Sequence, residues 1–374
     1  MQQRKEEDAL RSLGAASGDV DFSSNDYLGL SVHPEIIGHS AKLLEGQPKV
    51  MGATGSRLLT GDQKLYAELE SQLADFFAFE DALIFNSGYD ANLGLISSVP
   101  QRNDLIFYDE LVHASIREGI QLGNAKAYKF AHNDIEALNK LVERRLSDRS
   151  PGQEAYVITE SVFSMDGDSP DLVRLAAICD KYGLHLIVDE AHALGVFGKG
   201  LVHRYGLQNS VFAQIVTFGK AMGSHGAVIL GSAMLKAYLL NFARSVIYTT
   251  ALPGHSLAAI CAAFDFFDTP SGRLLSETLG RNIALFKKEI CDHGLEGLFL
   301  ASDSAIQVAM IPGNAKVKAL SGQLASSGYD VRPILAPTVK EGNERLRFCI
   351  HAFNTPAQIE GVVKKMKHYL EHGE

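Results

Sequence analysis

A single lysine, Lys220, lies between two apolar segments in the stretch from Val211 to Ser232. Ile215 and Val216 precede it and Ala227–Leu230 follows it, so both segments fit buried strands. Burial disfavours an ammonium group, and the lowered pKa that results makes a lysine amine a usable nucleophile. This is the chemistry of a lysine that forms a Schiff base. The pattern also fits a lysine at a strand end whose side chain reaches solvent.

Other polar residues follow apolar runs in the same way. Ser87-Gly88-Tyr89 comes after one such run, His113 after a second, and Asp189 ends a third. Free backbone N–H groups at a helix start favour a phosphate, and a buried carboxylate suits a protonated ring nitrogen. An imidazole can cover a flat ring. In this order, phosphate loop, aspartate and lysine are the parts of a pyridoxal phosphate site, although Ser87 also fits an ordinary helix cap and His113 a structural histidine.

Two other site types are excluded by spacing. Asp189-Glu190-Ala191-His192 resembles the acidic box of a nucleotide-dependent helicase, but no GxxxxGK[ST] precedes it. A zinc site on His185 and His192 has no third ligand at a suitable spacing, so we expect no metal. Of the two Gly-Lys pairs, neither belongs to a phosphate-binding loop of that type. The chemistry therefore points away from nucleotide hydrolysis.

Composition narrows the class of protein further. The chain has 374 residues and a net charge of −9, which argues against a nucleic-acid or anionic-membrane surface. No apolar run reaches the length of roughly 18 residues that a membrane span needs. The N-terminal dozen residues are charged and lack the apolar core of a signal peptide, and the four cysteines are widely spaced. We expect reduced cysteines and a cytoplasmic location.

Strands and helices alternate from residue 82 to residue 189, which predicts a mainly parallel sheet with helices on both faces. The turn signal at Thr269-Pro270-Ser271-Gly272 suggests a domain boundary, and the rest of the chain reads as α+β. We therefore expect an N-terminal arm over residues 1–28, a large domain over 29–270 and a small C-terminal domain over 271–374.

Seven motifs together resemble the α-oxoamine synthases, which are fold-type-I pyridoxal phosphate enzymes of the aspartate aminotransferase architecture. These motifs are SSNDYLGL (23–30), GSRLLTG (55–61), NSGYDAN (86–92), VHAS (112–115), VFSMDGD (162–168), VDEAHALGVFG (188–198) and TFGKAMGSHGA (217–227). They occur in the family's order over nearly the whole chain. The resemblance implies the fold of that family, with pyridoxal 5′-phosphate as cofactor.

The resemblance also implies residue roles. It makes Lys220 the Schiff-base lysine, Asp189 the partner of the ring nitrogen and His113 the imidazole stacked on the ring. Further cofactor contacts implied by it are Ser87, Gly88, Tyr89, Ser164, His192, Thr217 and, across a dimer interface, Thr250. On the substrate side it implies Arg347 for the amino acid carboxylate, together with Asn25, Thr338 and Arg11.

The wording of SNDYLGL and GSRLLTG is most similar to the members that condense L-alanine with a pimeloyl thioester in biotin synthesis. The alternative within the family is condensation of glycine or serine with another acyl-CoA. An aminotransferase on the same fold and a cofactor-binding regulator are two further alternatives. The expected partners are an amino acid, an acyl thioester on CoA or an acyl carrier protein, and a second copy of the chain.

Overall fold

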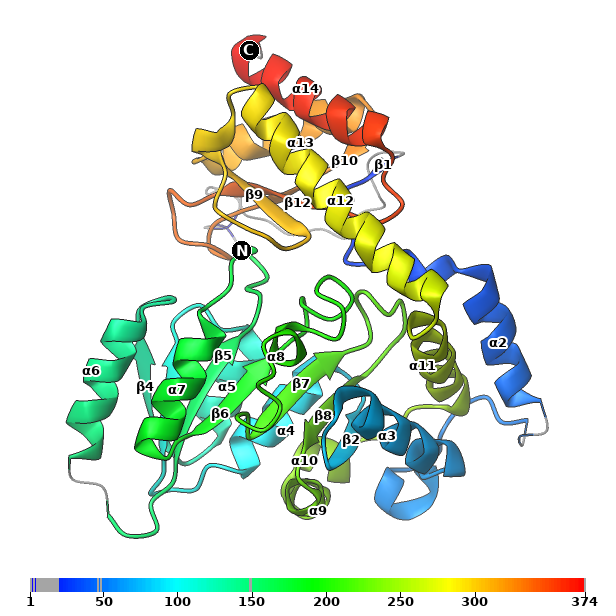
Figure 1. The fold of residues 1–374 in the computed structure, drawn as a ribbon, viewed down its shortest axis with the longest axis vertical. Coiled ribbons are helices and arrows are strands. Elements are labelled where there is room, and N and C mark those ends of the chain that lie inside the picture. Colours follow the sequence, from blue (N-terminus) through cyan, green and yellow to red (C-terminus); the bar gives the residue numbers. More distant parts are fainter. Residues whose placement is uncertain are drawn as a thin grey trace. The chain divides into compact units, whose positions relative to one another are not determined.

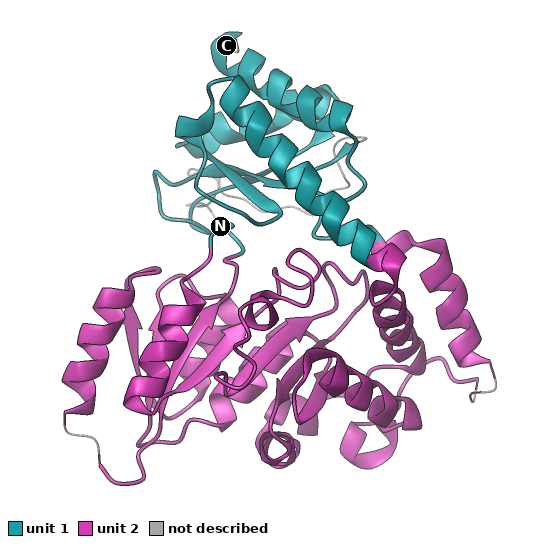
Figure 2. Ribbon diagram, viewed as in Figure 1, with its two compact units in different colours: residues 1–29, 164–168, 273–374 teal, residues 30–163, 169–272 magenta. Residues whose placement is uncertain are grey.

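The structure is a computed structural model that describes residues 2, 4, 20–45, 47, 49–147 and 150–372. It divides into two compact units (Figure 2). Unit 1 comprises residues 1–29, 164–168 and 273–374, and unit 2 comprises residues 30–163 and 169–272. The division into an arm, a large domain and a small domain stays a prediction, since unit 1 is built from three separate stretches of chain.

Unit 2 contains a seven-stranded sheet with helices on both faces, as the alternating pattern predicts (Figure 1). Strand β8 is antiparallel to both of its neighbours, and the other neighbouring pairs are parallel. The nine-residue loop between β7 and β8 is too short for a helical crossover, so the two strands pair as a hairpin. In spatial order the strands are β2 (Asp81–Phe85), β8 (Ala227–Gly231), β7 (Ala213–Thr217), β6 (His185–Asp189), β5 (Ala155–Glu160), β3 (Leu105–Asp109) and β4 (Lys126–Phe130).

Several helices of unit 2, among them α4 and α7, begin after a side chain that caps them. Ser87 accepts a hydrogen bond from Asp90 N and starts α4 at Gly88. Asp171 starts α7, and Gly183 ends it with a φ of 59°. The helices are α2 (Pro34–Leu44), α3 (Lys64–Phe77), α4 (Gly88–Ser98), α5 (Ala114–Leu122), α6 (Ile135–Leu146), α7 (Leu172–Tyr182), α8 (Leu201–Arg204), α9 (Ala233–Phe242), α10 (Arg244–Ile247) and α11 (Gly254–Phe267), with a 3-10 turn η1 (Leu30–Val32) and a π turn η2 (Arg57–Gly61).

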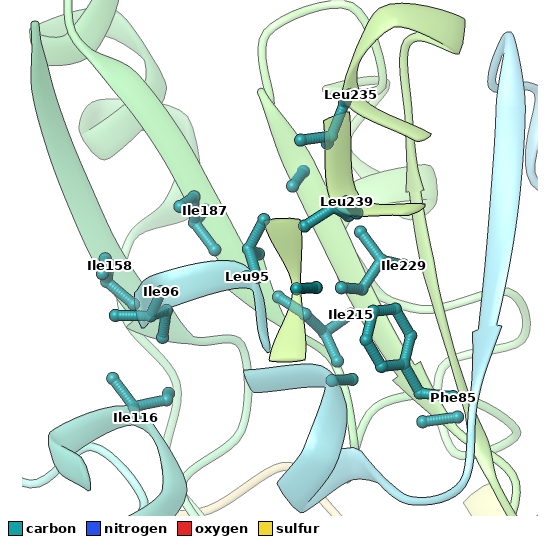
Figure 3. Packing of buried hydrophobic residues seen from close by; sticks show 14 of the residues in the cluster. Phe85, Leu95, Ile96, Ile116, Ile158, Ile187, Ile215, Ile229, Leu235 and Leu239 are labelled. Atoms are coloured by element: carbon teal, nitrogen blue, oxygen red, sulfur yellow. The ribbon is translucent and has the colours of Figure 1, made fainter. Parts of the chain in front are cut away.

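The core of unit 2 lies between the sheet and helices α4, α5 and α9. Side chains such as Leu95, Ile116 and Leu239 pack there against Ile187 and Ile215 of the strands (Figure 3). This packing fixes the carboxyl ends of the strands relative to the starts of α4 and α5. The polar residues that follow the strands are therefore held by a rigid frame.

Unit 1 contains a three-stranded antiparallel sheet in the order β11 (Arg332–Ile334), β12 (Arg345–Cys349), β9 (Ile306–Met310). A second, two-stranded sheet pairs β1 (Val20–Asp21) with β10 (Tyr329–Asp330) in parallel. The helices are α12 (Pro270–Asp292), which belongs to this unit from Arg273, α13 (Asn314–Ser326) and α14 (Pro356–His372), with a 3-10 turn η3 (Glu296–Leu298).

One predicted turn is only partly present. Thr269 lies in a bend, but α12 begins at Pro270, and Thr269 Oγ1 accepts a hydrogen bond from Gly272 N in the first helical turn. A proline suits that position, where its missing N–H has no helical partner. Among the described residues, no helix combines the length and apolar character that a bilayer crossing requires.

Candidate active site

Three strands of unit 2 end on polar residues at one edge of the sheet. Glu160 ends β5, Asp189 ends β6 and Thr217 ends β7. Because these strands are parallel neighbours, their carboxyl ends meet at the same edge, where ligands bind in sheets of this kind. Asp189 and Thr217 were expected from the sequence. Glu160 was not, although it ends an apolar run in the same way as Asp189.

Asp189 is buried, and its carboxylate is held by two N–H donors. Oδ1 accepts from Ala191 N at 2.9 Å and Oδ2 accepts from Asn92 Nδ2 at 2.7 Å. The side chain is 4% exposed. The donors fix the direction of the carboxylate at the sheet edge, as a partner for a ring nitrogen requires.

His113 caps the N-terminus of α5 with its ring. Its backbone N–H donates to Glu160 Oε1 at 2.6 Å, and its Nδ1 lies 2.7 Å from Ser115 Oγ. Partial burial lowers the pKa of His113; the charge of Asp189 opposes this shift and that of Lys220 adds to it. The three predicted residues are therefore within electrostatic reach of one another.

Glu160 is fully buried beside these groups. Burial raises its pKa well above the usual range, and the charge of Asp189 raises it further. Its hydrogen bond from His113 N and the charge of Lys220 act in the opposite direction. The site thus places two carboxyl groups on neighbouring strands, and one of them accepts a hydrogen bond from the backbone N–H of His113.

Lys220 lies in the loop that joins β7 to β8. Its Nζ donates to Thr217 Oγ1 at 3.5 Å, and its side chain is half-buried. Gly223 closes the loop with a φ of 59°, where a Cβ would come within 2.2 Å of Ser31 N. The predicted arrangement of one lysine between two buried strands is therefore present, and the tight turn fixes where the lysine leaves the sheet.

The start of α4 fits a phosphate group. Ser87 caps the helix, and a Cβ at Gly88 would come within 2.4 Å of Thr217 Cγ2. Only glycine allows the backbone N–H groups of the first turn to remain this close to the end of β7. Tyr89, the next residue, is 41% exposed.

The segment that carries Thr250 is attached to the start of the same helix. Asn86 Nδ2 donates to Thr249 Oγ1 at 3.0 Å and to Thr250 O at 2.8 Å. Thr250 itself is exposed. His192 lies in the turn that follows β6 and is 5% exposed.

Arg347 lies in unit 1 on β12 and is 7% exposed. Its Nε donates to Ser164 O at 2.7 Å, its Nη2 to Asn25 Oδ1 at 3.0 Å, and its Nη1 lies 3.0 Å from Cys349 Sγ. Three residues that the sequence predicts for the site, Arg347, Asn25 and Ser164, are therefore joined directly. Cys349 is a fourth member that sequence reasoning missed.

Two other residues predicted for the site are Thr338 and Arg11. Thr338 is exposed in unit 1, and its backbone N–H donates to Leu335 O. Arg11 lies outside the described residues. Among the described residues, no group of three metal-ligating side chains is present. Asn92 and Ser115, which sequence reasoning quoted only as parts of motifs, join the group around Asp189 and His113.

The chain resembles known proteins over nearly its whole length. Residues 17–366 match the family described as aminotransferase class I and II. The 8-amino-7-oxononanoate synthase of Emericella nidulans is 39% identical over 382 residues, which cover 96% of this chain and 91% of the relative. The 8-amino-7-oxononanoate synthase of Geobacter sulfurreducens is 36% identical over 381 residues, which cover 98% and 95%.

Two solved structures have the same fold. A variant serine palmitoyltransferase from S. paucimobilis with a bound PLP–myriocin aldimine aligns with a TM-score of 0.86, 27% identity and coverage of 96% of this chain and 91% of that one. The 8-amino-7-oxononanoate synthase of Francisella tularensis aligns with a TM-score of 0.76, 28% identity and coverage of 94% and 98%. The predicted aspartate-aminotransferase type of fold is confirmed.

Proposed function

The chain belongs to the class I and II aminotransferase family, and within it we propose an acyltransferase that makes 8-amino-7-oxononanoate. The reaction joins L-alanine to a pimeloyl thioester and releases CO2 and the free thiol, a step of biotin biosynthesis. The observation that carries this proposal is the identity of 36–39% to 8-amino-7-oxononanoate synthases over nearly the full length of the chain.

The cofactor is pyridoxal 5′-phosphate, and the residues of unit 2 fit it. The start of α4 offers N–H groups to a phosphate, the Asp189 carboxylate is oriented by two donors, and a half-buried lysine lies beside Thr217. When bound, this cofactor supplies an electron-accepting ring that stabilises negative charge on the amino acid's α-carbon.

Three residues carry the chemistry in this proposal. Lys220 would hold the cofactor through its amine and, once free, would act as the base that takes the α-proton. Asp189 would keep the ring nitrogen protonated, since a buried carboxylate favours a cationic partner. His113 would contact the ring through its imidazole.

The remaining contacts surround these three. We propose cofactor contacts by Ser87, Gly88, Tyr89, Ser164, His192, Thr217 and Thr250. Arg347 binds the amino acid carboxylate, because a guanidinium can donate two parallel hydrogen bonds to it. Its bonds to Asn25 and Ser164 fix the guanidinium plane before substrate arrives. Thr338 and Arg11 are proposed as further substrate contacts, Arg11 with the acyl group.

The related structures favour one second candidate. Several serine palmitoyltransferases align with TM-scores of 0.79–0.86 at 27–30% identity. The same cofactor site would serve serine or glycine with another acyl-CoA. The higher identity to the 8-amino-7-oxononanoate synthases supports alanine and a pimeloyl thioester over this alternative.

We also propose that the enzyme is a cytoplasmic homodimer. This rests on the resemblance, which implies that Thr250 contacts a neighbouring subunit's phosphate; Thr250 is exposed, and its backbone carbonyl accepts from Asn86 Nδ2. The four cysteines are free thiols, which suits a reducing compartment. Light scattering tests the dimer, and we expect the mass of two chains. Thr250→Ala tests the contact across the interface and should weaken cofactor affinity by about tenfold, because one charge-assisted hydrogen bond to the phosphate is lost.

Release of free thiol decides the substrates. The purified enzyme is supplied with pimeloyl-, acetyl-, succinyl- or palmitoyl-CoA, each with alanine, glycine or serine, and pimeloyl-loaded acyl carrier protein is tested with alanine. We expect rapid release only with a pimeloyl thioester and alanine. A preference for palmitoyl-CoA and serine would contradict the proposal and favour the second candidate.

A further inference from the structure

A continuous chain of buried polar groups connects Asp189 to the ring of His113. Asn92 Nδ2 donates to Asp189 Oδ2 at 2.7 Å and to Ser115 Oγ at 3.1 Å. Ser115 Oγ lies 2.7 Å from His113 Nδ1. Asn92 is 2% exposed and Ser115 is fully buried, so water does not compete for these contacts.

The available hydrogen-bond donors fix the direction of each hydrogen bond from Asn92 to His113. Both N–H bonds of the Asn92 amide donate hydrogen bonds, one of them to Ser115 Oγ, so the Ser115 hydroxyl accepts from Asn92 and its own O–H is left to donate. That O–H donates to His113 Nδ1. The Ser115 backbone N–H also donates to Nδ1, at 3.2 Å. A nitrogen that accepts two hydrogen bonds carries a lone pair and no proton.

The orientation of the Asn92 amide is itself fixed. Rotation by 180° would turn its oxygen toward the Asp189 carboxylate and repel it. In the present orientation Asn92 Oδ1 is buried and has no hydrogen-bond partner among the described residues. An unsatisfied buried acceptor is destabilising. The orientation is therefore kept by the two hydrogen bonds that the Asn92 amide donates.

A neutral ring suits this position for a second reason. His113 caps the N-terminus of α5, whose helix dipole disfavours a cation there. Lys220 acts in the same direction and Asp189 in the opposite one, and partial burial adds to the lowering of the His113 pKa. Glu160 accepts from the backbone N–H of His113, and the charge of Arg117 in α5 also lowers the His113 pKa.

We propose that Asn92 and Ser115 are positioning residues that hold His113 as its neutral Nε2–H tautomer and couple its orientation to Asp189. The consequence for catalysis rests on the proposed function. His113 then offers an N–H donor to a bound substrate and has no free lone pair on Nδ1 to take the α-proton. Lys220 is left as the base.

Ring ¹⁵N spectra of histidine-labelled, cofactor-free protein test the tautomer directly. The His113 signals are assigned by their loss in His113→Gln. Above the pKa, we expect a pyridine-type Nδ1 and a pyrrole-type Nε2. A pyrrole-type Nδ1 in the unaltered protein would overturn the inference, whether or not any variant folds.

Variants test the two positioning residues. Ser115→Ala removes one of the two donors to Nδ1, and we expect the Nδ1–H to Nε2–H ratio to rise by about tenfold. Asn92→Leu should change the ratio in the same direction by a smaller factor. Ser98→Ala is the matched control. The Ser98 hydroxyl is on α4, the helix of Asn92, and donates to Gly94 O at 2.6 Å, so its removal should leave the tautomer ratio unchanged.

Failure of this inference can be separated from failure of the proposed function. An unchanged tautomer ratio in folded Ser115→Ala and Asn92→Leu would contradict the positioning role. It would do so even if the thiol assay shows that a pimeloyl thioester and alanine are the substrates. Conversely, a different substrate pair in the thiol assay would leave the tautomer result standing.

Discussion

Unit 2 buries two groups of charged side chains, and the two are built differently. One group joins Glu70 to Arg57 and Lys236 beside β2. The other places Glu160 and Asp189 at the ends of β5 and β6 beside His113. The first balances a buried carboxylate with cations of the same chain. The second supplies its carboxylates mainly with neutral donors.

The Glu70 group is a structural ion cluster. Glu70 accepts from Arg57, from Lys236 Nζ at 3.1 Å and from Ile84 N at 2.9 Å, and Lys236 also contacts Asp81. It thereby links α3 to β2, η2 and α9. Removal of one buried partner from such a cluster leaves an uncompensated charge.

The Asp189 group has the character of a ligand site. Among the described residues, the hydrogen-bond donors to Asp189 and Glu160 are neutral N–H groups. Two carboxyl groups on adjacent strands repel each other, which contributes to the raised pKa of Glu160. A protonated cofactor ring would relieve this repulsion. The comparison teaches that burial alone does not identify a site, whereas two buried carboxyl groups whose hydrogen-bond donors are neutral N–H groups do suggest one.

The largest effect on activity is expected for Asp189→Asn. The neutral amide cannot hold a ring nitrogen protonated, so we expect kcat to fall by about 10²–10³-fold or more. The free energy of unfolding should change by about 1 kcal/mol or less. Thiol release and urea denaturation measure the two quantities. Near-normal turnover would remove Asp189 from the mechanism.

Glu70→Gln should lower stability and leave activity nearly unchanged, the reverse of Asp189→Asn. It leaves the Arg57 and Lys236 charges without their buried partner, and we expect the unfolding free energy to fall by about 3–5 kcal/mol. Activity per folded molecule should stay within about twofold. The control is Asp62→Asn, because this partner of Arg57 is exposed and its pair contributes about 1 kcal/mol or less. A large loss of kcat in folded Glu70→Gln would erase the contrast between the two groups.

A third prediction concerns unit 1. Arg347→Lys cannot reproduce the planar contacts with Ser164, Asn25 and a carboxylate, so the KM for the amino acid should rise by about tenfold or more. The KM for the acyl thioester should change little. Arg345→Lys is matched on the same strand, since Arg345 binds Asp166 at 2.6 Å. An equal rise in the amino acid KM for both variants would show that the strand, and not Arg347, sets it.

The smallest expected effect is on the pH dependence of stability. Because the pKa of His113 lies below its ordinary value, the unfolded chain binds more protons just below pH ~6.5. This contribution to the unfolding free energy is present above that pH and is lost as the pH falls through the folded-state pKa. His113→Asn should make the decrease shallower, and exposed His39→Asn should not.

The sequence predicts the parts of the site that close apolar runs. Asp189, Lys220 and Ser87 each follow a buried strand, and a parallel sheet brings such positions to one edge. Asn92 and Ser115 could not be found in this way, because a polar residue in a helix ordinarily faces solvent. Their burial depends on how α4 and α5 pack on the sheet.

Part of the fold is equally hidden from local patterns. β1 pairs with β10 across more than 300 residues, and two-residue strands carry no periodicity. The segment from Ala233 to Phe267 forms α9, α10 and α11, but α11 is apolar around most of its circumference and shows little amphipathic pattern. The antiparallel direction of β8 depends on a loop length and not on the strand sequence.

The central claim is that Lys220 is the residue that bonds the cofactor. Borohydride reduction of the purified, cofactor-loaded enzyme, followed by peptide mapping, tests it most directly. Lys199 is the internal control, because it also follows a glycine, but its Nζ donates to Phe76 O and lies 4.0 Å from the Phe76 ring centre. We predict one pyridoxyl group per chain, on Lys220. A label on Lys199 or on any other lysine would contradict the account.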